Sequence, residues 1–225
     1  FRQLQPGLQT QLGQSVLLEN LPGAGGSIGV MRVLASAPDG YTVLGTTASD
    51  LILAPLSLTS AKYDPSRLRL VAPVGGADFV LVSSPRFSFK NIDELLAYAQ
   101  QPGNKELSIG HWGRGSTPHI VGADLQNLGK VQFLEVPYKG VAPIIPDLMG
   151  GMVDLSFLPL GGPTLGLIKA GKVHAIGVSA ARRVPGLPDV PTLNEGKVIK
   201  GFEHQIWTGI FVDRNTGKAE VSKLA

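Results

Sequence analysis

The sequence contains no cysteine, which excludes disulfides, thiol catalysis and thiolate metal ligands. Charged residues are also scarce, at 16% of the chain, and a net charge of +3 offers little attraction to a nucleic acid. Long apolar runs are absent as well, because the longest are short segments such as 51–56, which cannot cross a bilayer. These absences leave a globular chain without a membrane span and without a nucleic-acid partner as the expectation.

The chain has 225 residues, of which 43% are hydrophobic, enough to bury a substantial core. Its 29 glycines and 17 prolines predict many tight turns. Apolar spacing predicts a helix that stops at Gly13, a strand over 15–19, a helix over 27–37 and a strand over 41–46. Strand and helix patterns go on alternating with short connections, which predicts an α/β fold with a parallel sheet covered by helices. The chain opens on Phe1 without a signal peptide, so a mature or truncated chain is expected.

A glycine-rich loop, PGAGGSIG at 22–29, separates the predicted strand at 15–19 from the helix at 27–37. A dinucleotide site in this position requires G-x-G-x-x-G, and Ile28 stands where the last glycine belongs. The next strand also ends in threonines rather than in an acidic residue. We interpret the loop as a tight turn that packs a helix against a strand, and we expect no cofactor.

A second loop, GRGSTPH at 113–119, follows a strand and opens a helix. Backbone amides at a helix start carry partial positive charge, and Ser116 and Thr117 add hydroxyl donors, so this loop is typical of a carboxylate or phosphate site. Ordinary N-capping by either hydroxyl is the alternative. Thr46, Thr47 and Ser49 also follow a strand, where open α/β sheets place ligands, although a plain polar loop would look the same.

Signals of catalysis are missing. The four histidines have no zinc-binding spacing, the acidic residues form no acid–base pair, and the pattern around Ser116 does not match a nucleophile elbow. No catalytic residue and no metal site are therefore expected.

Five strings occur in order along the chain: LGQSVLLENLPGAGGSIG, ASAPDGYTVLGTTAS, GRGSTPH, VPYKGVAP and IKAGKVHAIGVSAARRVPGLPDVPTLNEG. Together they resemble the Bug family, the extracytoplasmic solute-binding receptors of tripartite tricarboxylate transporters. The resemblance runs from about Leu12 to about Phe211.

The resemblance implies a two-lobed periplasmic-binding-protein fold of type II, each lobe a mainly parallel sheet flanked by helices, with a ligand cleft between the lobes. Residues 1–83 with 205–225 are expected to form lobe one, and 84–204 lobe two. Family members begin with a strand and a ligand-gripping loop before the first helix. This chain is expected to lack both and to stop early in its last helix, which would leave its site incomplete.

The implied function is capture of a small organic carboxylate in the periplasm, by a monomer that delivers it to the membrane subunits of a transporter. Two alternatives stay open, namely a ligand-loaded sensor subunit for a two-component system and an α/β enzyme. The resemblance places ligand contacts at Thr46, Thr47 and Ser49 in lobe one, and at Gly115, Ser116, Thr117 and His119 in lobe two, with Tyr138 and Gly140 nearby.

Leu158 marks a departure from the family pattern. Many members have an aspartate directly after the phenylalanine that corresponds to Phe157, where it can meet an ammonium or hydroxyl group of the ligand. Because Leu158 offers no such partner, we expect it to line a site for an acid without an amino group, either a dicarboxylate or an aromatic carboxylate.

Overall fold

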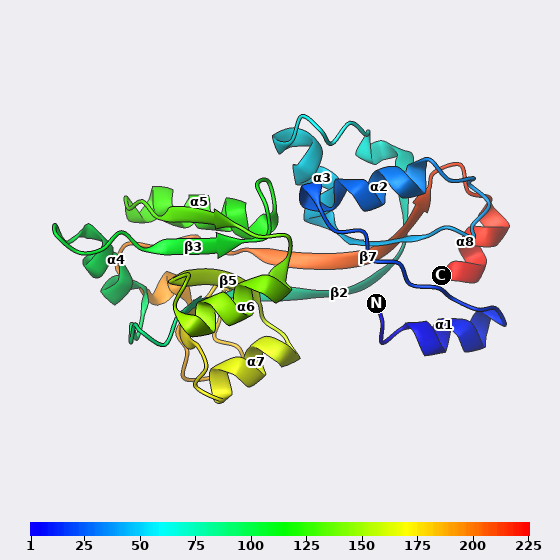
Figure 1. Cartoon of the computed structure of the whole chain (residues 1–225). Helices are drawn as coiled ribbons and strands as arrows, with labels where there is room; N and C mark the ends of the chain where they lie inside the picture. The colour runs from blue at the N-terminus through cyan, green and yellow to red at the C-terminus, as the bar shows by residue number, and fades with distance from the viewer. The chain divides into compact units, whose positions relative to one another are not determined.

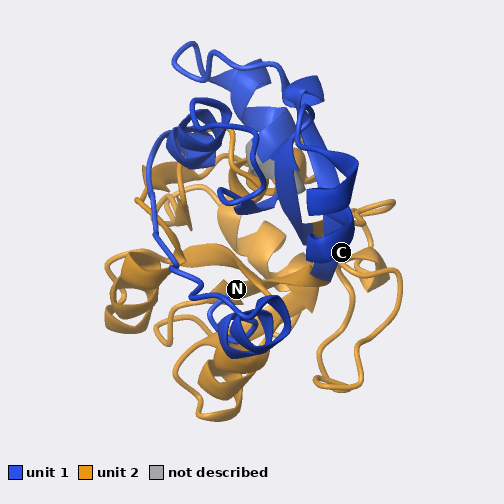
Figure 2. Ribbon diagram, turned by 90° about the vertical axis from the view of Figure 1, so that its right-hand side faces the viewer, with its two compact units in different colours: residues 1–75, 207–225 blue, residues 76–206 orange. Residues whose placement is uncertain are grey.

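The computed structural model describes residues 1–47 and 51–225 in full, and of residues 48–50 only their place in a helix. Ser49, a predicted ligand contact, therefore lies outside the described residues. The chain forms two compact units, unit 1 with residues 1–75 and 207–225, and unit 2 with residues 76–206 (Figure 2). Two strands, β2 (Leu68–Ser83) and β7 (Gln205–Asp213), carry the chain from one unit to the other.

Unit 1 pairs strand β1 (Leu44–Thr47) antiparallel with β7, so that Leu44 lies opposite Phe211. Alternation along β1 buries Leu44 and Thr46 on one face of the pair. Leu44 and Phe211 pack there with apolar residues of the neighbouring helices. The helices of this unit are α1 (Gln5–Leu12), η1 (Ala24–Gly26), α2 (Ser27–Leu34), α3 (Ala48–Ser57), η2 (Pro65–Arg67) and α8 (Lys218–Leu224).

In unit 2 the strands pair in the order β6-β2-β5-β3-β4, of which β2, β3 and β5 are labelled in Figure 1. Strand β3 runs parallel to both β4 and β5, whereas β2 pairs antiparallel with β5 and β6. The strands besides β2 are β3 (Ser108–His111), β4 (Leu134–Pro137), β5 (Leu155–Pro159) and β6 (His174–Val178). The helices are α4 (Ile92–Gln100), α5 (Thr117–Gly129), α6 (Val141–Gly150), α7 (Gly162–Lys169) and η3 (Leu193–Glu195).

Alternation along β2 explains why this strand is apolar on both faces. Phe79 and Leu81 belong to one buried cluster, and Val80 and Val82 belong to another. Because successive side chains point to opposite faces of a sheet, the two clusters cover its two sides. The run FVLV is therefore a central strand with helices packed on both faces.

The parallel strands give the sheet of unit 2 two distinct edges. We call the edge where β3, β4 and β5 end the carboxyl edge, and the edge where they begin the amino edge. Helices α5, α6 and α7 each follow one of these strands, so they begin at the carboxyl edge. Since β2 runs antiparallel to β5, helix α4 follows β2 at the amino edge.

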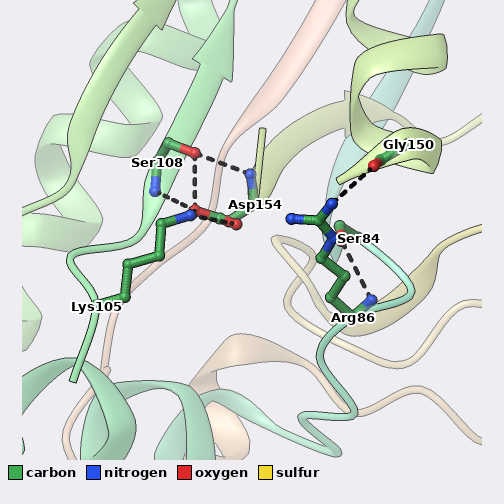
Figure 3. A network of polar contacts seen from close by, with 6 residues as sticks. All are labelled: Ser84, Arg86, Lys105, Ser108, Gly150 and Asp154. Carbon is green, nitrogen blue, oxygen red and sulfur yellow. Dashed lines mark hydrogen bonds and ion pairs between the residues drawn. The ribbon is translucent and has the colours of Figure 1, made fainter. Parts of the chain in front are cut away.

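A buried polar network joins β3 to β5 at the amino edge (Figure 3). Asp154, 1% exposed, accepts hydrogen bonds from the amide and the hydroxyl of Ser108 at 2.9 and 2.8 Å. Its carboxylate also lies 3.1 Å from the ammonium group of Lys105. The amide of Asp154 in turn donates to the Ser108 hydroxyl. Every polar group of this serine–aspartate pair is thus used, as burial demands.

Several local expectations were wrong. Residues 15–19 form no strand, and Leu17 is 92% exposed, because no described segment pairs with them to satisfy their backbone groups. Helix α3 was not predicted, since Pro55 lies inside it. Strand β2 is a single strand of 16 residues, whereas the apolar pattern predicts two separate strands at 71–74 and 79–83.

The sheets are also mixed rather than mainly parallel. The difference comes from β2 and β7, which run through both units and pair antiparallel with their neighbours. Residues 79–83, expected in lobe one, lie in unit 2 because they pair with β5 and β6. The predicted lobe boundaries stay a prediction.

Candidate functional site

Three helices begin at the carboxyl edge without a side-chain cap from a described residue. Helices α5, α6 and α7 follow Ser116, Gly140 and Gly161, and among the described residues none of the three has a side-chain cap. None has an acidic residue in its first turn either. Helix α4, at the amino edge, is capped by Asn91 and carries two acidic residues in its first turn. The carboxyl edge therefore gathers partial positive charge that no acidic residue of these first turns neutralises.

In the loop before α5, the Ser116 hydroxyl bonds within the loop and does not cap the helix. Ser116, 1% exposed, donates a hydrogen bond from Oγ to the carbonyl of Gly113 at 2.6 Å. Thr117 follows, and its Oγ1 is buried without a hydrogen-bond partner in the part of the chain that the structure describes. Neither hydroxyl caps α5, so ordinary N-capping does not explain this pair.

His111 is the last residue of β3 and is 2% exposed. Its Nδ1 accepts a hydrogen bond from the amide of Gly113 at 3.2 Å, which places the proton of the neutral ring on Nε2. Nε2 is buried and has no partner among residues 1–47 and 51–225. Burial, and then the neighbouring His119, lower the pKa of His111 below its ordinary value. The ring is therefore a neutral N–H donor that has no hydrogen-bond partner among the described residues.

His119 and Glu135 lie beside this ring. The His119 and His111 ring centroids are 4.8 Å apart, and His119 Nε2 lies 3.4 Å from a carboxylate oxygen of Glu135. The three side chains could be arranged around a metal ion, because their ligand atoms lie within 4.8 Å of one another. However, the amide of Gly115 donates to His119 Nδ1 at 3.2 Å, so both rings carry their proton on Nε2. A metal needs a free lone pair there, and the arrangement instead offers N–H donors.

Tyr138 joins the next strand to this loop. Its amide donates to the carbonyl of His111 at 2.8 Å, and its hydroxyl donates to Asp147 Oδ2 at 2.7 Å. Burial, and then the bond to Asp147, raise the pKa of Tyr138 to about 12. Gly140 precedes α6, and no atom lies within 4 Å of the position where a side chain would begin. The tyrosine thus positions the loop, and the glycine keeps the start of α6 open.

The other predicted site residues are placed differently. Leu158 was expected to line the site, but it is fully buried in the apolar cluster that contains Val80, so its side chain does not face a ligand. Thr46 and Thr47 end β1 in unit 1, and both already make interactions. The structure therefore brings together the lobe-two residues, in one loop and the two helix starts beside it.

Sequence reasoning missed His111 and Glu135. The apolar pattern predicts a strand over 107–110 before the glycine-rich loop, and His111 directly follows it, at the strand end where ligands bind in open α/β sheets. That position was the available signal. Glu135 lies within β4, and nothing in the sequence indicates that it faces a histidine from another element.

Comparison with known proteins identifies the family. The model of the tripartite tricarboxylate transporter family receptor matches residues 1–225. This chain belongs to that family. The match confirms the resemblance to the Bug proteins, and the family is one of transporter receptors rather than of enzymes.

Curated relatives agree with this assignment. The chain is 32% identical over 219 residues to a protein encoded in the tcbD-tcbE intergenic region of Pseudomonas sp. strain P51, covering 96% of this chain and 64% of the relative. It is 34% identical over 193 residues to protein BugT of Bordetella pertussis, covering 84% of this chain and 58% of BugT. The chain thus spans less than two thirds of the length of these relatives.

Solved structures agree with the fold. The periplasmic binding protein BugD is 36% identical with a TM-score of 0.90, covering 99% of this chain and 74% of BugD. MatC from Rhodopseudomonas palustris, solved with bound malate, is 30% identical with a TM-score of 0.90, covering 99% and 75%. A further R. palustris protein, solved with adipate, is 29% identical with a TM-score of 0.91, covering 99% and 74%. The expected type II binding-protein fold is confirmed. Among the described residues, no helix combines the length and apolar character that a membrane span needs.

Proposed function

We propose that this chain captures a small organic carboxylate in the periplasm for a tripartite tricarboxylate transporter. The observation that carries the proposal is a pair of buried donors at the carboxyl edge of unit 2, His111 Nε2–H and the Thr117 hydroxyl, which lack partners among the described residues. Membership of a receptor family supports it, as do relatives solved with malate and adipate.

The two donors suit an oxyanion because each can give a hydrogen bond to a carboxylate oxygen. The first turn of α5 adds free backbone amides and the positive end of the helix. None of these groups is a fixed cation, so their contribution to stabilising the ligand charge comes from dipoles. Binding of this kind is strong enough for capture and weak enough for release to a membrane partner.

We further propose that the ligand has no ammonium group. An ammonium needs an acceptor, and the resemblance to the Bug family implies a carboxylate at the position where this chain has Leu158. The two carboxylates beside the loop are already engaged, Glu135 with His119 and Asp147 with Tyr138. The chemistry therefore favours a plain dicarboxylate or an aromatic acid over aspartate or glutamate. Membrane subunits of the transporter are the proposed partner.

A thermal-shift screen tests the proposal. Succinate, malate, adipate, citrate, benzoate, aspartate and glutamate would each be added at about 1 mM. A ligand with a Kd of about 10 µM then stabilises the protein by about 2.7 kcal/mol, which raises Tm by about 5–10 °C. We expect a shift with one or more of the acids that lack an amino group. A shift confined to the amino acids would contradict the ammonium argument, and no shift with any acid would contradict the receptor function.

A further inference from the structure

A second buried hydroxyl group without a partner lies in unit 1. Ser27 is the first residue of α2 and is 0% exposed. Its Oγ makes no hydrogen bond to any residue that the structure describes. A buried hydroxyl that bonds to no described residue costs free energy, so Ser27 leaves a donor available to a group that binds from outside.

The loop before Ser27 curls back on itself through two backbone hydrogen bonds, from the amide of Gly26 to the carbonyl of Gly23 and from the amide of Ser27 to the carbonyl of Ala24. Gly23, Ala24, Gly25 and Gly26 have φ angles of 116°, 47°, 60° and 84°, so four successive residues lie in the left-handed region. Ala24 is one of only two non-glycine residues with positive φ among those described. The segment is therefore the tight turn that the sequence indicated, and we call it the cradle because its curl leads into the start of α2.

Helix α2 completes the cradle. It has no side-chain cap within the described ranges and no acidic residue in its first turn. The first amides of a helix have no partner inside the helix, so those of Ile28 and Gly29 face the same region as the Ser27 hydroxyl. Ala24 is exposed and the glycines beside it are half-buried, which leaves a route from solvent. The hydroxyl of Ser27 and the amides of Ile28 and Gly29 can donate here, while the carbonyls of Gly23 and Ala24 already accept bonds within the turn.

We infer that the segment from Gly23 to Gly29 is a second oxyanion site, which binds a carboxylate group through the Ser27 hydroxyl and the first amides of α2. The inference rests on the proposed function only for the choice of a carboxylate as the anion. It implies that the chain recognises carboxylate groups in unit 1 as well as in unit 2.

The test combines stability and binding in one variant. Ser27→Ala removes the hydroxyl without removing a bond, so Tm without ligand should rise by about 2 °C. The same variant should bind malate, or whichever acid the screen identifies, at least fivefold more weakly by calorimetry. Ser36→Ala is the matched control, because Ser36 lies just after α2 and its hydroxyl bonds to the carbonyl of Arg32 on the exposed surface. This control should leave acid binding unchanged.

Amide chemical shifts separate this inference from the proposed function. On titration with the acid, the amides of Ile28 and Gly29 should move in the unaltered chain and stay still in Ser27→Ala. If the signals of His111 and Thr117 move while Ile28 does not, the unit 1 site is overturned and the receptor site stands. If Ile28 moves and Thr117 does not, the inference stands and the proposed site in unit 2 fails. A Ser27→Ala protein that binds the acid as tightly as the unaltered chain overturns the inference.

Discussion

The two edges of the unit 2 sheet use the same kinds of polar groups in opposite ways. Strand β3 begins at Ser108, whose amide and hydroxyl both bond to the buried Asp154. It ends at His111, whose buried Nε2 bonds to no described residue. Strand β3, which has four residues, thus connects two polar networks. The one at its start is complete, because its buried groups are hydrogen-bonded, and the one at its end is open, because buried donors there have no described partner. The complete network stabilises the fold, whereas the proposed function assigns the open one to ligand binding, at a cost in stability.

Helix starts show the same contrast. Asn91 caps α4 at the amino edge, and Glu94 at the same helix start accepts a hydrogen bond from the amide of Lys90. At the carboxyl edge three helices start without a cap among the described residues. Substitutions at the amino edge should therefore lower stability, whereas substitutions at the carboxyl edge should lower binding and spare stability.

The largest expected effect is at the amino edge. Asp154→Ala leaves the amide and hydroxyl of Ser108 buried without their acceptor, and should destabilise the protein by about 3 kcal/mol. Urea denaturation measures this loss. Lys105→Met is the matched control, because the Lys105 side chain is 64% exposed and should contribute less than about 1 kcal/mol. Equal losses for the two variants would contradict a network centred on the buried carboxylate.

At the carboxyl edge the sign of the stability change should reverse. Thr117→Val keeps the shape of the side chain and removes a hydroxyl that bonds to no described residue, so Tm should stay constant or rise. Binding of the acid found in the screen should weaken about tenfold, a loss of about 1.4 kcal/mol. Calorimetry and a melting curve on one sample measure both quantities.

Thr192→Val is the control for that reversal. Thr192 is also buried, but its hydroxyl accepts a bond from the amide of Glu195 in a capping box. Its loss should cost about 1 kcal/mol and leave acid binding unchanged. If Thr117→Val destabilised the protein more than Thr192→Val, the described difference between the two edges would be contradicted.

The buried histidine should make stability depend on pH. Because the folded-state pKa of His111 lies below its unfolded value, the unfolded chain binds more protons as the pH falls through the ordinary histidine range. Stability should therefore fall on acidification from about pH 7.5 to 5.5. His111→Gln should flatten this part of the Tm–pH curve. His174→Gln, at a ring that bonds to the carbonyl of Phe87, should leave the slope due to His111 in place.

The smallest expected effect is at Tyr138. Tyr138→Phe removes the bond to Asp147 and should destabilise the protein by about 1 kcal/mol, measured by urea denaturation. Acid binding should change less than twofold, because the tyrosine positions the loop through its amide, which the variant keeps. A tenfold loss of binding would show that the phenol itself contacts the ligand.

The sequence predicted the helix starts better than the side chains around them. The pattern at 113–119 indicated a loop that follows a strand and opens a helix, expected over 119–128, and α5 begins two residues earlier, at Thr117. It could not indicate which hydroxyl bonds within the loop, because that depends on the position of the Gly113 carbonyl.

Contacts between distant segments were beyond the reach of the sequence. Glu135 meets His119 only because β4 lies beside β3, and Leu158 is buried only because both faces of the sheet are covered. The prediction of a strand at 15–19 was wrong for a related reason. An apolar pattern predicts a strand, but it does not show whether a partner strand is available.

The most direct test of the open network follows the His111 ring itself. The protein would be labelled with ¹⁵N in its histidine rings. Without ligand, the neutral His111 ring should carry its proton on Nε2. On saturation with the acid that raises Tm, the Nε2–H signal of His111 should shift as it donates to the carboxylate, while the His174 signals stay in place. An unchanged His111 signal at saturation would mean that its missing partner is not the ligand, and the contrast between the two edges would lose its functional meaning.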